Sequence, residues 1–258
     1  IDLINSIGAA GTAWLRLSFG ALIFIAIVRP SLRSLQRSDI PALLSLGVAT
    51  GLMSIAFLAA IERIPLGTAV AIEFLGPLTV AAFRSHSVRA LIWPVLAFLG
   101  VLLVTRPWLG DINLVGVGFA ALAALGWAIY ILLTQHVGDR FDGIQGLAFT
   151  IPVAAATAAV VGIPQSAGHL TFGAVLAAAG LAILLPVIPF ALEMLALRRM
   201  THNAFGTLMS LEPAIGVLLG LVILGQVMSP TQLAGVAIVI VAGASSQRQG
   251  RRPENSGV

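Results

Sequence analysis

The sequence contains no cysteine and little charge, since only 9% of its 258 residues are Asp, Glu, Lys or Arg. Without cysteine the protein can form no disulfide, no thiolate nucleophile and no cysteine-ligated metal site. Soluble domains carry about 25% charged residues, so this composition argues against a water-soluble domain. The apolar share of 59% indicates an integral membrane protein instead.

Sequence motifs of catalysis are also missing. There is no nucleophile elbow and no glycine-rich phosphate loop. No two histidines among His86, His136, His169 and His202 have the spacing of metal ligands. These absences argue against an enzyme or an ATP-driven pump, and the sequence predicts neither a cofactor nor a metal site.

Lysine is absent too, so all 14 basic residues are arginines, and the net charge is +4. Because most of them lie in short connections between apolar runs, they indicate membrane topology rather than a nucleic-acid partner. If the end of the first apolar run is cytoplasmic, two arginines are outside, Arg63 and Arg106, and eleven are inside. The C-terminus is then predicted to be cytoplasmic. The inside set is Arg29, Arg33, Arg37, Arg84, Arg89, Arg140, Arg198, Arg199, Arg248, Arg251 and Arg252.

Nine apolar segments remain between these connections. A membrane-spanning helix needs about 20 apolar residues, so the fold class predicted is all-α, a polytopic membrane helix bundle without a soluble domain. Two GxxxG spacings, Gly47/Gly51 and Gly216/Gly220, predict close helix contacts. The nine segments are Gly11–Val28, Ile40–Ile61, Leu66–Phe83, Ala90–Val104, Val115–Thr134, Ile144–Ile163, Phe172–Leu197, Ala204–Leu224 and Thr231–Ser245.

Two of these segments combine a carboxylate with a proline. Glu73 precedes Pro77, and Glu212 directly precedes Pro213. An ionisable side chain at membrane depth is costly and therefore suggests a functional site, although a structural hydrogen bond between helices is the alternative. Proline cannot donate a backbone N–H, so it weakens the helix one turn earlier. A charge beside a broken helix is typical of transporter binding sites.

The two stretches also suggest an internal repeat. A shift of 136 residues places Ala60, Arg63, Leu75 and Pro77 on Ala196, Arg199, Leu211 and Pro213. The second half then has five helices and the first half four, with its first member expected before Gly11. An odd number of helices per half requires the halves to insert with opposite orientation, a transporter signature. We therefore predict ten helices in two inverted five-helix repeats, nine of them visible: a half at 1–107, a half at 115–246 and a disordered cytoplasmic tail at 247–258.

Three further residues are candidates for the binding site. Glu193 lies near the predicted cytoplasmic end of its helix, where it could bind substrate, anchor the helix at the interface or pair with Arg198 or Arg199. Trp127 and Tyr130 are three residues apart and so share one helix face. That face is either a cavity wall or part of an aromatic belt at the membrane interface.

Two prolines and one arginine inside apolar segments complete the set. Pro186 and Pro189 should kink their helix and leave carbonyl groups free to face a substrate, or serve packing alone. Arg16 is predicted either to extend its side chain to the outer interface or to pair with a glutamate.

Three runs of the sequence resemble a known family: PLGTAVAIEFLGPLTVA at 65–81, GWAIYILLTQ at 126–135, and ALEMLALRRMTHNAFGTLMSLEPAIGVLLGLVILGQ at 191–226. They are similar to the threonine/homoserine exporters of the EamA family, within the drug/metabolite transporter superfamily. The resemblance implies ten helices in two inverted halves, location in the bacterial inner membrane, and export of small amino acids by secondary transport.

The sequence as a whole therefore predicts an alternating-access exporter with a central cavity lined by Glu73, Trp127, Tyr130, Glu193 and Glu212. A carboxylate would engage the substrate ammonium, aromatic residues would face its side chain, and protons are a second expected partner beside the lipid bilayer. Two alternatives stay open: the same fold with a different cargo, and a membrane scaffold that transports nothing. Monomer and homodimer are both compatible with the sequence.

Overall fold

The computed structural model describes residues 2–31, 35–64, 66–83, 88–106, 108, 113–141, 144–197, 199–200, 208–209, 211 and 229–249. The candidate residues Glu212 and Pro213 lie outside this described part, and so do Arg198, Gly216 and Gly220. Most of the predicted segment Ala204–Leu224 and residues 250–258 of the predicted tail lie outside it as well.

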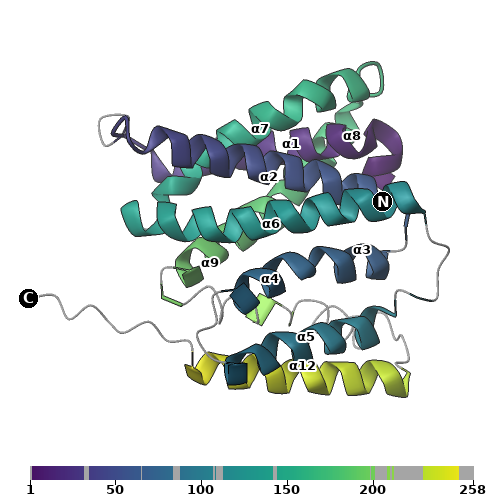
Figure 1. Ribbon diagram of the computed structural model, residues 1–258. Helices are drawn as coiled ribbons and strands as arrows, with labels where there is room; N and C mark the ends of the chain where they lie inside the picture. The colour runs from purple at the N-terminus through teal and green to yellow at the C-terminus, as the bar shows by residue number, and fades with distance from the viewer. Residues whose placement is uncertain are drawn as a thin grey trace, which may run out of the picture.

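Every regular element in the described part of the chain is a helix, and the long helices run back and forth across the molecule in alternating directions (Figure 1). Within the described ranges, five stretches are long and apolar enough to cross a membrane: Leu3–Val28, Ile40–Ile61, Leu114–Arg140, Gln145–Ser166 and Phe172–Leu197. The predicted all-α membrane bundle is thereby confirmed. The elements are α1 (Asp2–Val28), α2 (Ile40–Ile61), α3 (Leu66–Glu73), α4 (Leu75–Phe83), α5 (Val88–Thr105), α6 (Leu114–Arg140), α7 (Gln145–Ser166), α8 (Phe172–Ala182), the π-helical turn η3 (Ile183–Val187), α9 (Ile188–Leu197) and α12 (Pro230–Gln249).

Several helix ends differ from the prediction because polar residues continue the helices beyond their apolar runs. Helix α6 continues past Thr134 to Arg140. There the Gln135 amide donates to the carbonyl of Leu197 at 3.3 Å, and Arg140 pairs with Asp39 at 3.1 Å. Helix α1 begins at Asp2, well before the predicted start. Helix α12 runs to Gln249 and so takes in the first residues of the predicted tail.

Helix α1 is interrupted at Gly8, whose backbone has a positive φ of 78° that favours glycine. The N–H groups that begin the second part of α1 therefore need acceptors from elsewhere. The Ala9 N–H donates to Glu62 Oε1 at 2.9 Å, and the Ala10 N–H donates to Gln165 Oε1 at 2.7 Å. Two distant side chains thus cap a helix start inside α1.

Glycines bring the helices into close contact, as the first GxxxG spacing predicted. A Cβ atom on Gly47 would lie 2.5 Å from Cβ of Val153, and one on Gly51 would lie 2.7 Å from the carbonyl oxygen of Ala154. Both neighbours belong to α7, so α2 packs with its backbone close to α7. A Cβ on Gly76 of α4 would overlap the carbonyl oxygen of Ala124 on α6.

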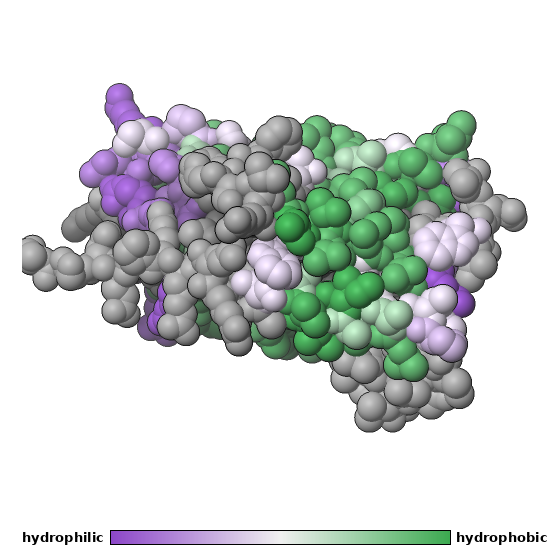
Figure 2. All heavy atoms as spheres, turned by 60° about the horizontal axis from the view of Figure 1, so that its bottom comes forward, coloured by the Kyte–Doolittle hydropathy of each residue, from purple (hydrophilic) through white to green (hydrophobic). Residues whose placement is uncertain are grey.

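The surface carries a band of hydrophobic residues across the middle of the molecule, with hydrophilic residues towards its two ends (Figure 2). Leu22, Val160 and Leu176 are among the large apolar side chains left exposed. In water such a surface would be costly, whereas lipid tails cover it. The chain is a multi-pass membrane protein.

Candidate substrate cavity

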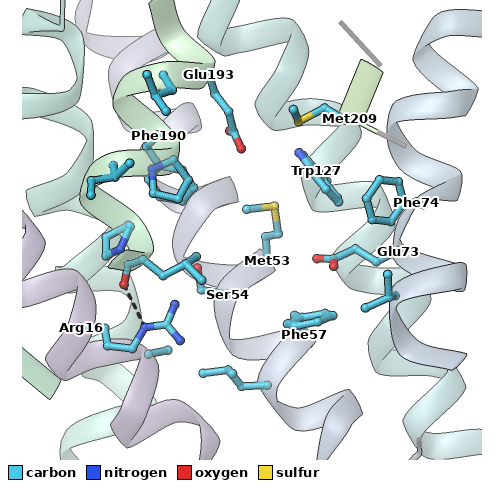
Figure 3. A pocket seen from close by; sticks show the side chains of 18 of the residues that line it. Arg16, Met53, Ser54, Phe57, Glu73, Phe74, Trp127, Phe190, Glu193 and Met209 are labelled. Carbon is cyan, nitrogen blue, oxygen red and sulfur yellow. Dashed lines mark hydrogen bonds between the residues drawn. The ribbon is translucent and has the colours of Figure 1, made fainter. Parts of the chain in front are cut away.

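A cavity of about 970 Å³ opens between α1, α2, α3, α6, η3 and α9 (Figure 3). Its size is at the upper end of small-molecule sites, about 300–1,000 Å³. The walls are mostly apolar, and charged groups enter from three sides. The lining residues are Ala13, Arg16, Leu17, Met53, Ser54, Phe57, Leu58, Val70, Glu73, Phe74, Trp127, Leu185, Pro186, Ile188, Pro189, Phe190, Leu192, Glu193, Ala196, Leu208, Met209 and Leu211.

Glu73 is the last residue of α3, and its side chain lines the cavity although the residue is only 9% exposed. The predicted third spanning segment is broken directly after it, at Phe74, and resumes as α4. Pro77 explains this position, because it has no N–H to donate to the Glu73 carbonyl and its ring crowds that carbonyl. The carboxylate therefore stands at a helix break.

The aromatic candidates lie in the middle of α6 because this helix extends to Arg140. Trp127 is 7% exposed, lines the cavity and packs edge-on against Phe74, with ring centroids 5.1 Å apart. An interface belt near a helix end is therefore the wrong interpretation for Trp127 and Tyr130. Tyr130 is fully buried behind the cavity wall. Its ring packs against that of Phe190, which lines the cavity, with the ring centroids 5.3 Å apart.

Glu193 lies on α9 and points into the cavity (Figure 3). It interacts electrostatically with the hydroxyl of Tyr130, which comes from the neighbouring α6. The structure thus places Glu193 on the cavity rather than at an interfacial anchor. Glu73, Trp127 and Glu193 line one space, Tyr130 stands directly behind it, and Glu212 lies outside the described residues.

Both candidate prolines of the seventh segment line the cavity, where the helix is distorted into the π-turn η3. Leu185 is non-helical, with φ −157° and ψ 106°. In a regular helix its carbonyl would accept from residue 189, but Pro189 has no N–H to give. The freed carbonyl accepts instead from Nε of Arg16 at 3.2 Å.

Arg16 is therefore a cavity residue that the sequence-based site prediction missed. Helix α1 starts at Asp2, so Arg16 lies deep in the helix rather than within reach of its outer end. It also takes part in neither of the two ion pairs found among the described residues, Arg63–Glu62 and Arg140–Asp39. Both earlier interpretations, an interfacial side chain and a glutamate partner, are replaced by a bond to the Leu185 carbonyl. The sequence does indicate that the Leu185 carbonyl, four residues before Pro189, lacks its usual helical donor. It does not indicate that Arg16 donates to this carbonyl instead.

Among the described residues, the cavity combines the two carboxylates of Glu73 and Glu193 and the guanidinium of Arg16 with apolar and aromatic walls. Such a site can bind a small polar solute through its charges and cover its carbon atoms with the aromatic surface. Within the part of the chain that the structure describes, no group of three His, Asp or Glu residues could hold a metal ion.

Comparison with known proteins gives consistent results. Residues 114–244 match the EamA-like transporter family. The threonine/homoserine exporter RhtA of Escherichia coli K12 is 38% identical over 95% of this chain and 84% of its own length. RhtA of Salmonella typhimurium LT2 is 37% identical over 97% of this chain and 86% of its own length.

A solved crystal structure shares the fold with a TM-score of 0.77, covering 96% of this chain and 91% of the other, at 18% identity. The sequence relatives are transporters and not enzymes. Because the family match spans half of the chain and the exporters match nearly all of it, the chain belongs to the EamA-like transporter family.

Proposed function

We propose that this protein exports threonine, homoserine and similar small amino acids across the bacterial inner membrane by alternating access. One observation carries the proposal: the chain is 38% identical, over 95% of its length, to a threonine/homoserine exporter. The carboxylate-bearing cavity among its helices supports it. Intramembrane carboxylates are costly unless they serve a pathway or a partner, and this cavity supplies such a pathway.

The roles of the site residues follow from their positions. Glu73 engages the substrate ammonium, and Glu193 offers a second carboxylate on the opposite side of Trp127, with Glu212 as the candidate from the other predicted half. Trp127 covers the substrate's short side chain. Tyr130 orients Glu193 from behind. The helix breaks near Pro77, Pro186 and Pro189, together with the break that the sequence predicts at Pro213, permit the helices to bend as access alternates.

The architecture proposed is ten helices in two inverted halves, at residues 1–107 and 115–246, with the C-terminus in the cytoplasm. Helix packing supports it. Under a shift of 136 residues α1 corresponds to α7 and α5 to α12. These corresponding helices pack against each other in two antiparallel pairs (Figure 1), as expected for an axis in the membrane plane.

Proton coupling is part of the proposal, because a carboxylate that binds an ammonium ion can release it on protonation. The test uses everted membrane vesicles, in which export appears as uptake. Vesicles containing the protein should accumulate labelled L-threonine faster than vesicles without it, and an uncoupler should abolish the difference. If the uncoupler leaves threonine uptake unchanged, proton coupling is wrong, but export of threonine is still supported. Uptake of some other solute, with none of threonine or homoserine, would show that the cargo is wrong.

A further inference from the structure

We propose that Arg16 binds the carboxylate of the transported amino acid, so that the cavity recognises a zwitterion by both of its charges. This inference rests on the proposed function, because it assigns the group of the same site that binds the negative charge of the substrate. It makes Arg16 a specificity-determining residue that distinguishes amino acids from simple amines.

The position of Arg16 is fixed by the distortion of the adjacent helix at η3. Its Nε donates to the Leu185 carbonyl at 3.2 Å, and that carbonyl is available because Pro189 cannot donate to it. Nε is used for this bond, and no bond of the two terminal nitrogens is found among the described residues, so we assign these nitrogens to the substrate. Figure 3 shows the guanidinium group lying at one side of the cavity with these nitrogens directed inward.

The surroundings favour an anion at this point. Among the described residues Arg16 takes part in neither ion pair, so no carboxylate is paired with its guanidinium there. A cation removed from water is costly unless it is paired. A carboxylate is a good partner because its two oxygens match two parallel N–H donors of arginine.

The carboxylate proposed to bind the substrate ammonium lies on another wall of the cavity. Glu73 comes from α3, and Arg16 from α1, and Figure 3 shows them on opposite sides of the cavity with Met53, Ser54 and Phe57 of α2 between them. An amino acid carries its ammonium and carboxylate on the same carbon atom. A substrate held at both poles is therefore fixed in orientation, which leaves its side chain to face the apolar wall.

The test compares L-threonine with L-threoninamide, which keeps the ammonium group but has no carboxylate. Purified full-length protein is titrated with each ligand at about pH 6, where both amines are protonated, and apparent affinities are taken from ligand-induced thermal stabilisation. Wild type should prefer threonine by about 10- to 100-fold, the range expected for a hydrogen-bonded charge pair. In Arg16→Gln this ratio should fall to about one, mainly through loss of threonine binding.

Two variants complete the design. Arg37→Gln removes the same charge from an exposed residue outside the cavity and should keep the wild-type ratio. Arg16→Lys keeps the charge, but lysine lacks the rigid fork that bonds Leu185 and a carboxylate together, so its ratio should fall by about tenfold. This second variant decides the question should Arg16→Gln not fold.

The outcomes separate the two proposals. If wild type exports threonine but its ratio is close to one, or the Arg16 variants keep the wild-type ratio, the role of Arg16 is wrong and the exporter remains. If wild type neither takes up nor binds threonine, the proposed cargo is wrong, and the inference about Arg16 is overturned with it.

Discussion

Glu73 is the residue on which the proposed transport cycle depends most. It is buried, faces the cavity and stands at a helix break. We expect Glu73→Gln to lower threonine uptake into everted vesicles by about 10- to 100-fold, because the neutral amide loses the charged partner of the substrate ammonium. The similar shape of glutamine should leave the folding of the protein unchanged, which size-exclusion chromatography checks.

The matched control is Asp139→Asn, which removes one carboxylate charge from an exposed position at the end of α6. It should transport as wild type does. Equal uptake by Glu73→Gln and wild type would show that the carboxylate of Glu73 takes no part in substrate binding.

The residue scale is also where the sequence shows both its strength and its limit. An acid inside an apolar segment is visible from composition alone, so Glu73 could be singled out without a structure. Trp127 allowed two interpretations, because the apolar run stops at Thr134 while α6 continues. Arg16 could not be placed, since its acceptor is the carbonyl of a residue 169 positions away.

At the scale of elements, the contact between α4 and α6 allows a stability prediction. A Cβ on Gly76 would overlap the Ala124 carbonyl, which belongs to the backbone and cannot rotate away. Gly76→Ala should therefore push α4 from α6 and destabilise the protein by about 1–3 kcal/mol. Because α4 follows the break at Glu73, uptake of threonine should fall too. Thermal unfolding and vesicle uptake measure the two effects.

Gly118→Ala is the control on the partner helix. Among the described residues, no atom outside the adjoining turns of its own helix lies within 4 Å of the added methyl group. Alanine also favours a helix over glycine by up to about 1 kcal/mol. Its unfolding temperature should equal or exceed that of wild type. Matching unfolding temperatures for the two glycine variants would contradict the close packing of α4 on α6.

The interruption of α1 at Gly8 allows a second prediction about an element. The Gln165 side-chain oxygen accepts from Ala10 and Gly11 at 2.7 and 3.2 Å. Gln165→Leu leaves both N–H groups without this acceptor and should cost about 1–3 kcal/mol. Gln165→Glu keeps an oxygen there and should stay close to wild type, since a helix start also favours a negative charge.

Hydrogen exchange at the amides of Ala10 and Gly11 reports this cap directly. Exchange should become faster in Gln165→Leu and stay slow in Gln165→Glu. Unchanged protection in Gln165→Leu would mean that the cap contributes nothing to the start of this helix part.

Most helices could be located from the sequence because each apolar run must be long enough to cross the bilayer. The interruptions within them could not all be located. The break before Pro77 follows from a local rule about proline, and so does the distortion around Pro186 and Pro189. The break at Gly8 depends on Glu62, at the end of α2, and on Gln165 of α7, which reach it only where α2 and α7 pack against α1.

At the scale of the whole molecule, the proposal requires the two halves to insert with opposite orientation. The packing of α1 on α7 and of α5 on α12 is compatible with such a relation. Arginine distribution gives an independent argument, because eleven arginines fall on the side assigned to the cytoplasm and two on the other. Both arguments concern topology, which can be measured without any assumption about substrate.

The last prediction uses the absence of cysteine from the chain, since any introduced thiol is then unique. Arg63 and Arg199 occupy matched positions under the shift of 136 residues that relates the two predicted halves. In intact cells a membrane-impermeant maleimide should label Arg63→Cys but label Arg199→Cys only after permeabilisation. His169→Cys, in the connection between α7 and α8, should label like Arg63→Cys. Labelling of Arg63→Cys and Arg199→Cys from the same side would mean that the halves are threaded alike, and alternating access between inverted halves would then have no structural basis.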